Sequence, residues 1–444
     1  MPSVMLISLG CEKNLINSEQ MLHLLVDEGF NLVGDAIDAD AVVINTCGFI
    51  DSAKQEAIDN ILALGALKEE GRLGKILVTG CLAQRYQEEI VKEMPEVDGI
   101  LGTGSYYDVV GAVKKVLAGR QVLQFDDIDA PLDETDRILT TPEHYAYLKI
   151  AEGCDNHCAY CIIPALRGKF RSRELDDVLY EARKLAQDGV KEIIVVAQDI
   201  TRYGIDLDGH ELLLPKLMRE LCRIDGIHWV RLHYLYPEVL TDEMIDVIAE
   251  EPKIVKYIDL PIQHINNEIL RKMNRRGDKD FLIGMFRKLR ERVPGVVLRT
   301  SLITGLPGEG EEEFEELCQF LRDMKLERVG AFVFSPQEGT LAATMEYPPQ
   351  EVAQKRAEQL AELQSRIMDA YNESLLGTTM EILCEGCDPE EDAYFGRSYG
   401  DSPDIDGKVW FFADRIVKVG EFVNVEITDV YDGELVGELE EDGE

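Results

Sequence analysis

The sequence predicts an α/β protein made of two successive parallel-sheet regions and a small β-barrel. Three observations lead to this prediction. Apolar runs alternate with amphipathic helical patterns over residues 1–122, the alternation begins again near residue 146, and only short strand patterns remain after residue 377. Strand–helix–strand alternation is typical of parallel sheets covered by helices, whereas short strands separated by turn residues are typical of small all-β modules.

The first region, residues 1–122, is expected to form a parallel sheet with helices on its faces. Its strands are short apolar runs rich in Val, Ile and Leu, expected at Val4–Leu9, Ala41–Asn45 and Lys75–Thr79. Amphipathic patterns predict helices at Ser18–Glu28 and Ser52–Leu67. The polar and acidic residues that follow indicate a linker over residues 123–143.

The central region, residues 144–375, carries further apolar runs with helical patterns between most of them. This arrangement predicts a partial or full barrel of parallel strands, expected at Ala146–Ile150, Glu192–Ala197, Trp229–His233, Tyr257–Leu260, Val297–Ile303 and Gly330–Phe334. Residues 376–444 predict a small antiparallel β-barrel with strands at Met380–Cys384, Gly407–Phe412 and Phe422–Val430.

Composition excludes several classes of protein. The chain has 46 basic and 85 acidic residues, a net charge of −39, so tight nucleic-acid binding is not expected and a basic protein partner is favoured. No stretch suits a membrane span and the N-terminus lacks a signal-peptide pattern, so we expect a cytoplasmic protein without a membrane partner. In that reducing compartment its ten cysteines are expected to be metal ligands or buried thiols.

The strongest chemical signal is a run of three cysteines, Cys154, Cys158 and Cys161, on a loop after the first strand of the central region. Three thiolates within eight residues suit one face of a 4Fe-4S cluster, and without a fourth local ligand one iron stays open to bind a further molecule. The alternative is a zinc site with His157 as the fourth ligand. His157 adjoins Cys158, however, and would not easily point at the same metal.

Three cysteines of the N-terminal region occupy equivalent positions. Cys11, Cys47 and Cys81 are separated by 36 and 34 residues, about one βαβ unit each, and each lies just beyond a predicted strand. Parallel strands share a direction, so the three thiols are expected at one carboxyl edge, where ligands bind in open α/β sheets. They would hold a second cluster with an open iron. The alternative is that each is a small buried core residue.

These features together resemble a known family. The Cys-x3-Cys-x2-Cys spacing resembles the hallmark of the radical S-adenosylmethionine (SAM) superfamily, in which it opens a (β/α)6 partial barrel. The combination with an N-terminal three-cysteine α/β domain and a C-terminal module similar to an OB-like TRAM domain resembles the methylthiotransferases over nearly the whole chain.

The resemblance implies a radical mechanism with two 4Fe-4S clusters and SAM. The cluster on the Cys154 motif would cleave SAM to a 5′-deoxyadenosyl radical, fed by an electron donor such as flavodoxin or ferredoxin. The cluster on the N-terminal cysteines would carry the sulfur, and a second SAM would donate the methyl group. The net reaction would replace C–H by C–S–CH3.

Several segments are similar to the RimO type of this family, which modifies the β-carbon of an aspartate in small-subunit ribosomal protein S-twelve, free or in the subunit. They are Ser8–Asn14, Ala197–Tyr203, Arg231–Pro237, Tyr257–His264 and Gly396–Pro403 with Asp406-Gly407. Two positions depart from that pattern: Glu12 stands where proline is usual, and Ile16-Asn17 where valine and aspartate are common.

The charge of the C-terminal module favours the same branch. Residues 378–444 hold 20 acidic and 4 basic residues, a net charge of −16, which suits a basic ribosomal protein better than tRNA. The alternatives are that the acidity only serves solubility, that the chain is a MiaB-like enzyme acting on tRNA adenosine, or that it is a non-catalytic iron–sulfur or zinc protein.

Four residues are candidate SAM contacts because they follow barrel strands at their carboxyl ends, where barrel active sites lie. They are Gln198, Asp199, Gln263 and Gly305, the last allowing close backbone approach. The alternative for Gln198 and Asp199 is a polar cap on the strand. Beyond the Cys154 motif, the basic run from Arg167 to Arg173 would balance the charge of the cluster or of a substrate carboxylate, or form a solvated face.

Overall fold

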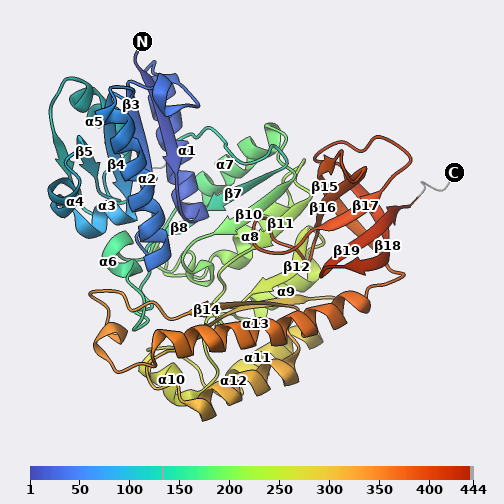
Figure 1. The fold of residues 1–444 in the computed structure, drawn as a ribbon. Coiled ribbons are helices and arrows are strands. Elements are labelled where there is room, and N and C mark those ends of the chain that lie inside the picture. The colour runs from blue at the N-terminus through green and yellow to red at the C-terminus, as the bar shows by residue number, and fades with distance from the viewer. Residues whose placement is uncertain (133–134, 441–444) are drawn as a thin grey trace.

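The computed structural model describes residues 1–132 and 135–440 (Figure 1). Within these residues two six-stranded parallel sheets precede a closed five-stranded barrel, so the predicted fold class is confirmed. Residues 133–134 of the expected linker and 441–444 of the expected module lie outside the described residues. The domain boundaries expected at residues 122, 143 and 375 stay predictions.

The N-terminal sheet is parallel throughout, with strand order β2-β1-β3-β4-β5-β6. The strands are β1 (Ser3–Ser8), β2 (Asn31–Leu32), β3 (Ala41–Thr46), β4 (Lys75–Gly80), β5 (Gly99–Leu101) and β6 (Val122–Gln124). The three expected strands correspond to β1, β3 and β4. The other three are too short to leave a hydrophobic pattern in the sequence.

Helices cover both faces of this sheet, and the side-chain alternation of β3 shows how. Val42 and Ile44 pack with α2, α3 and α4, whereas Ala41 and Val43 face α1 and α5. The helices are α1 (Glu12–Asp27), α2 (Asp51–Glu69), α3 (Cys81–Tyr86), α4 (Glu88–Glu93) and α5 (Val109–Leu117). The first helix begins well before the predicted Ser18, directly after Cys11.

The central sheet is an open partial barrel with strand order β14-β13-β12-β11-β10-β7, all parallel. Its strands are β7 (Tyr145–Lys149), β10 (Glu192–Val196), β11 (Trp229–Leu232), β12 (Ile254–Asp259), β13 (Val297–Thr304) and β14 (Arg328–Val333). Each expected strand overlaps one of them.

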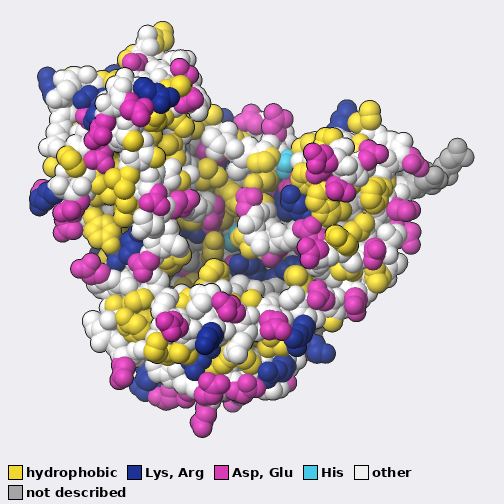
Figure 2. Space-filling view, viewed as in Figure 1, with side chains coloured by type: hydrophobic (Ala, Val, Ile, Leu, Met, Phe, Trp, Pro, Cys, Tyr) yellow, Lys and Arg dark blue, Asp and Glu magenta, His cyan; other side chains and the backbone are white. Residues whose placement is uncertain are grey.

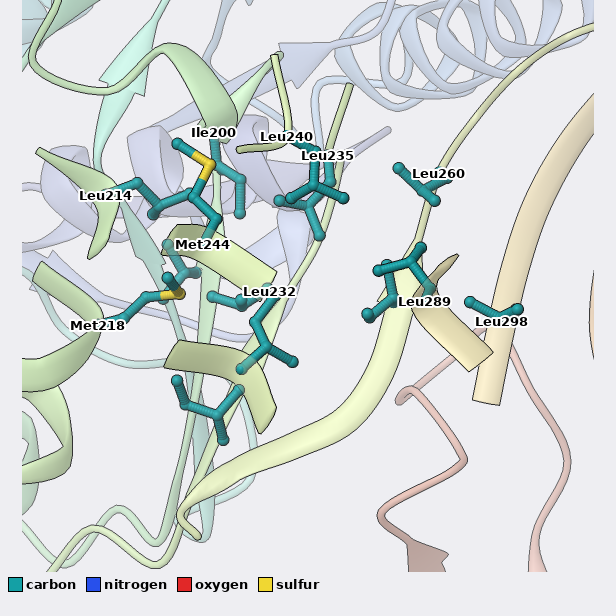
Figure 3. Close-up of a cluster of buried hydrophobic side chains, with 14 of the residues drawn as sticks. Ile200, Leu214, Met218, Leu232, Leu235, Leu240, Met244, Leu260, Leu289 and Leu298 are labelled. Atoms are coloured by element: carbon teal, nitrogen blue, oxygen red, sulfur yellow. The ribbon is translucent and has the colours of Figure 1, made fainter. Parts of the chain in front are cut away.

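Helices pack on the outer face of the partial barrel and enclose the largest apolar core. Figure 3 shows part of it, where Met218 and Met244 lie among leucines from strands and helices. The helices of this region are α6 (Ile163–Arg167), α7 (Leu175–Gln187), α8 (Leu214–Cys222), α9 (Asp242–Glu250), α10 (Asn267–Lys272), α11 (Lys279–Arg292), α12 (Glu311–Met324) and α13 (Gln350–Glu373). No helix in the described part of the chain combines the length and apolarity of a membrane span.

The C-terminal module is a closed barrel in the order β15-β16-β17-β19-β18. Its strands are β15 (Thr379–Asp388), β16 (Ala393–Ser398), β17 (Val409–Phe412), β18 (Phe422–Tyr431) and β19 (Glu434–Leu439). Pairing is antiparallel except between β17 and β19, which run parallel. The three expected strands correspond to β15, β17 and β18.

A segment at the end of β16 and beyond it packs against the amino-terminal part of the partial barrel. We call residues 397–406 the plug loop. Arg397 pairs with Glu192 of β10 at 2.7 Å, and Arg328 of β14 pairs with Asp401 at 2.7 Å. These inward-facing charges are buried and paired, because an unpaired charge in the low-dielectric interior would be strongly destabilising. The segment Gly396–Pro403, whose sequence is similar to the RimO type, therefore has a structural role in joining the module to the barrel.

Further contacts run along the same loop. Tyr257 donates to Asp406 at 2.7 Å, the Ser402 hydroxyl lies 2.9 Å from His233 Nε2, and Arg231 donates to the Tyr399 carbonyl at 2.9 Å. The contacts come from several strands of the partial barrel, so the module is fixed to it across the sheet.

Candidate active site

The three N-terminal cysteines lie together at the carboxyl edge of the first sheet, after β1, β3 and β4. Gly10, directly before Cys11, has a φ of 91°, and a Cβ there would lie 2.7 Å from the Cys47 Cβ. A Cβ on Gly48 would lie 2.9 Å from the carbonyl carbon of Cys81. Glycine is therefore required twice for the backbone segments that carry these thiols to approach each other.

The pKa values of Cys47 and Cys81 respond to burial and to the other thiols of the set. Burial raises the pKa of Cys47 to about 11, and the charges of Cys81 and Cys11 add to the rise. Burial also raises the pKa of Cys81, against the opposing charge of Arg167. A bound metal would take these thiols as thiolates.

The central cysteines lie on the loop after β8 (Ala151–Glu152), which pairs with β9 (Arg171–Ser172). Cys154 and Cys158 are buried and Cys161 is half-buried. Burial raises the pKa of Cys154 to about 11, with the charge of Cys158 contributing, and that of Cys161 rises through burial and both other thiols. The structure thus brings this second set of predicted ligands together as well.

The zinc alternative finds no support in this geometry. His157 has a φ of 49° and is exposed, whereas the three cysteines beside it are buried or half-buried. Among the described residues no group of three or more His, Cys, Asp or Glu side chains is set to hold a single metal ion. A cubane cluster binds each thiolate through a different iron and so needs wider spacing than a tetrahedral ion.

The segment after α10 clamps the cysteine loop. The Ala159 N–H donates to the Met273 carbonyl at 2.9 Å, and Asn274 Nδ2 donates to the His157 carbonyl at 2.9 Å. Arg275 is buried and its Nη1 lies 3.7 Å from Cys158 Sγ. Sequence reasoning missed Arg275 because more than a hundred residues separate it from the cysteines and no motif marks it.

Gln198 lies beside the cysteine loop with an incomplete set of hydrogen bonds. Its Nε2 donates to Glu152 Oε1 at 2.7 Å, and its Oε1 is buried with no partner among the described residues. A buried amide oxygen without a partner is costly and is usually satisfied by water or a ligand. Gln198 therefore fits its predicted role as a contact of a bound molecule.

The Asp199 carboxylate holds neighbouring segments in place through several hydrogen bonds. It accepts from Asn156 Nδ2 at 2.9 Å, from Arg202 Nε at 3.0 Å and from the Thr201 N–H at 3.1 Å. Burial raises its pKa. These contacts match the polar-cap alternative, and they tie the cysteine loop, through Asn156, to the end of β10.

Gln263 and Gly305 shape the carboxyl ends of β12 and β13. Gln263 has a φ of 71°, donates its N–H to the Ser301 carbonyl at 2.9 Å and accepts from the Ile303 N–H at 2.8 Å. Gly305 has a φ of 79°, and a Cβ there would collide with Ala353 of α13. The glycine is thus needed for helix packing, whatever it contacts besides.

The solvated-face alternative for the basic run is wrong at two of its four positions. Arg167 and Arg173 are 5% and 6% exposed, whereas Arg171 is half-buried and Lys169 exposed. Arg173 Nη1 pairs with Glu181 at 2.5 Å. Arg167 Nε lies 3.3 Å from Cys81 Sγ, so it meets the N-terminal cysteines and not those of its own loop.

Direct contacts dock the N-terminal domain on the barrel. Lys13 Nζ lies 3.8 Å from the centroid of the Tyr234 ring, Arg85 donates to Gln337 Oε1 at 2.6 Å, and Thr103 donates to the Leu166 carbonyl at 2.5 Å. The carboxyl edge of the first sheet therefore faces the cysteine loop of the barrel. Figure 1 shows the two regions side by side.

Comparison with known proteins defines the class. The radical SAM superfamily model matches residues 148–321, the TRAM domain model residues 376–439, and the model of uncharacterized protein family UPF0004 residues 3–102. Radical SAM methyltransferase TsrM of Kitasatospora setae shares the fold, with a TM-score of 0.56 at 15% identity over 76% of this chain and 75% of that one. The protein is a radical SAM enzyme.

Curated relatives then identify the family. The chain is 46% identical over 442 residues to "Ribosomal protein uS12 methylthiotransferase RimO" of Thermoanaerobacter sp. (strain X514), covering 99% of this chain and 100% of the relative. The protein of the same name from Anaeromyxobacter sp. (strain Fw109-5) is 48% identical, covering 98% and 93%. The chain belongs to the RimO family of methylthiotransferases.

Membership in the radical SAM superfamily implies a 4Fe-4S cluster and SAM. The described residues fit both groups. Three mutually close, shielded thiols supply the soft donors that an iron–sulfur cluster needs, and the unpartnered Gln198 oxygen offers an acceptor beside them.

Proposed function

We propose that this enzyme replaces one hydrogen on the β-carbon of an aspartate in ribosomal protein uS12 by a methylthio group. The observation that carries the proposal is the similarity to curated uS12 methylthiotransferases over 98–99% of the chain. The tRNA alternative is not favoured, because the relatives are named for uS12 and the module is acidic.

Cys154, Cys158 and Cys161 are proposed to hold the cluster that binds SAM, and Gln198 to accept a hydrogen bond from SAM. Gln263 and Gly305 form the neighbouring strand ends, and Asp199 keeps the loop in place through Asn156. When bound, the cluster and SAM supply the radical that removes a hydrogen atom. Buried side chains around the loop exclude water, which such a reactive species requires.

Cys11, Cys47 and Cys81 are proposed to hold a second 4Fe-4S cluster, which supplies the sulfur. Their shared position at one sheet edge, their mutual electrostatic effects and the two close glycine contacts support this. Sulfur transfer to a carbon-centred radical needs the two sites close together. The docking contacts of Lys13 and Arg85 with the barrel would maintain that proximity.

The partner is proposed to be uS12, free or in the small ribosomal subunit, met in the cytoplasm. Figure 2 shows acidic side chains over the module, and a net charge of −16 over residues 378–444 would attract a basic ribosomal protein. The plug loop joins the module to the amino-terminal end of β10. The module would therefore dock the partner without supplying reacting groups. The electron donor is proposed to be a flavodoxin or ferredoxin.

The decisive experiment is the intact mass of uS12 from a host that lacks its own enzyme, with and without this gene. We expect a gain that equals one methylthio group in place of hydrogen, located on an aspartate by fragmentation. A chain with Cys158→Ala is the matched control and should give no gain. Unmodified uS12 in the presence of soluble enzyme with both clusters would overturn the proposal and direct attention to tRNA nucleosides.

A further inference from the structure

Arg167 joins the two cysteine sites. It ends α6 in the barrel, six residues after Cys161, yet its guanidinium lies against the N-terminal domain. Nε donates to Cys81 Sγ at 3.3 Å, Nη1 donates to Asn17 Oδ1 at 3.2 Å, and Nη2 donates to Asn14 Oδ1. The side chain is buried, so these contacts are shielded from solvent screening.

The charge balance around this guanidinium favours an anionic partner on the cysteine side. Glu152 Oε2 lies 3.2 Å from Arg167 Nη1 but is shared with Lys149, whose Nζ lies 3.4 Å away. The contacts across the domain boundary are two neutral amides and the Cys81 thiol. A buried guanidinium is stabilised by a fully charged partner, and a thiolate at Cys81 would supply one.

The need is reciprocal. Three thiolates and a cluster bring negative charge to an edge where Glu152 is also negative and the amides of Asn14 and Asn17 are uncharged. The nearby ammonium of Lys13 is paired with Glu12 at 2.6 Å. Hydrogen bonds to the sulfurs and the local charge are among the features that set the reduction potential of an iron–sulfur cluster. An N–H donor with a permanent positive charge serves both purposes at once.

We propose that Arg167 is a positioning residue of the sulfur-donating site, which charge-balances the cluster of the N-terminal domain and raises its reduction potential. Because Arg167 belongs to the barrel, the N-terminal cluster has this raised reduction potential only while the two domains are docked. The inference rests on the proposed function, since it takes Cys11, Cys47 and Cys81 as ligands of a cluster.

The test isolates the second cluster. In a chain with Cys154, Cys158 and Cys161 all changed to alanine, the N-terminal site is reconstituted with iron and sulfide under anaerobic conditions. Arg167→Gln and Arg167→Lys are then compared with that parent and with Lys169→Gln, which removes an exposed positive charge two residues away. The readouts are iron and sulfide per chain, and the midpoint potential from an EPR-monitored redox titration.

We expect Arg167→Gln to shift the midpoint potential to a more negative value, because the reduced cluster loses a neighbouring positive charge. Arg167→Lys keeps the positive charge but lacks the several N–H donors of the guanidinium, and its midpoint potential should lie close to that of the parent. Lys169→Gln should leave the potential at the parent value. In the otherwise native enzyme, Arg167→Gln should lower methylthio product about tenfold while 5′-deoxyadenosine formation persists.

Equal potentials in the parent, Arg167→Gln and Arg167→Lys would overturn the inference. A negative shift of the midpoint potential in Arg167→Lys as large as in Arg167→Gln would also overturn it, because a purely structural role predicts the same shift in both variants. Failure of the proposed function looks different. If Cys47→Ala in the same background still binds the full complement of iron, the second cluster itself is wrongly assigned.

Discussion

Ten cysteines occur in this chain, and their surroundings separate the candidate ligands from the rest. Cys222 and Cys318 lie within α8 and α12 with their side chains in the apolar core. Each candidate ligand instead lies on a loop or at a helix start, at the carboxyl end of a strand. The N-terminal thiols meet thiols that follow neighbouring strands, and the central thiols meet one another on one loop, whereas Cys222 and Cys318 meet apolar side chains.

Replacing one thiol in each set should separate the two half-reactions. Cys158→Ala should abolish SAM cleavage and, with it, all product, because the SAM-binding site loses a ligand. Cys47→Ala should leave SAM cleavage in place and stop sulfur insertion. Chromatography of 5′-deoxyadenosine and the mass of uS12 measure the two steps. Full methylthio transfer by Cys47→Ala would refute the assignment of the N-terminal set.

Gly10 is expected to be essential for assembling the N-terminal thiols. Gly10→Ala places a Cβ 2.7 Å from the Cys47 Cβ and also strains a backbone at φ 91°. Gly29→Ala is a matched control, because it has the same strain at φ 89° and nothing within 4 Å. Both variants should lose about 1 kcal/mol of stability from the strain.

The two variants should differ in metal loading. Gly10→Ala should lose iron bound at the N-terminal site after reconstitution, whereas Gly29→Ala should retain it. Iron analysis in the background without the Cys154 set measures the difference, and thermal melting confirms that both chains fold. Equal iron in both variants would show that the approach of Gly10 to Cys47 is not required.

At the scale of secondary-structure elements, a stretch of the expected linker joins α1 to α7. Glu19 of α1 is fully buried and pairs with Arg137 at 2.6 Å, and Arg137 Nε pairs with Glu181 of α7 at 2.8 Å. Glu19 also accepts from the Thr140 N–H at 2.7 Å. The segment is thus a fixed strap between the N-terminal domain and the barrel and not a free connection.

Arg137→Ala should therefore destabilise the whole chain. It leaves the fully buried Glu19 without its guanidinium partner, whereas the half-buried Glu181 keeps Arg173. Removing one partner of a buried ion pair is expected to cost about 3–5 kcal/mol. Arg366→Ala removes an exposed partner of Glu362 and should cost less than about 0.5 kcal/mol. Urea unfolding of both variants measures the difference. Equal midpoints would show that the strap contributes nothing.

At the scale of the whole molecule, the plug loop makes the module part of the barrel. Glu192 begins β10 and is fully buried between Arg397 of the module and Arg231 of the barrel, at 2.7 Å from each. Burial would raise the pKa of Glu192, but the two guanidinium groups outweigh it and hold the pKa at about 2. The contact that docks the module is thus sensitive to acid.

The stability contributed by Glu192 should fall as the pH falls. Its folded pKa lies below the ordinary value of 4.5, so the ionised group stabilises the fold above that value and the gain is lost as pH approaches 2. At neutral pH, Glu192→Gln should cost about 3–5 kcal/mol because it leaves buried guanidinium groups underpaired. Thermal melting from about pH 6 to about pH 3 should show the gap to the native chain narrowing.

Glu268→Gln provides the comparison for this pH series, because Glu268 pairs with Arg271 on an exposed helix surface. Its melting curve should follow that of the native chain at each pH. A gap between the native chain and Glu192→Gln that stays constant down to the acid limit would contradict the role given to Glu192.

The sequence by itself determined the fold class, most of the longer strands, and the two sets of three cysteines, but it did not predict β16 and β19, which have six residues each. Local periodicity and the common direction of parallel strands were sufficient for that, because both are properties of neighbouring residues. The strands of two or three residues, such as β2 and β5, left no pattern. The early start of α1, directly after Cys11, also escaped prediction.

Only the tertiary structure decided how the regions meet. Arg167 belongs to one cysteine loop by sequence and to the other by contact, and Arg397 is part of an acidic module yet completes the buried charges of the barrel. Gln198 and Asp199 are adjacent, but the Gln198 side-chain oxygen has no partner among the described residues, whereas the Asp199 carboxylate accepts hydrogen bonds from Asn156, Thr201 and Arg202. The reason is physical: burial and charge pairing depend on residues that are distant in the chain, and no local pattern records them.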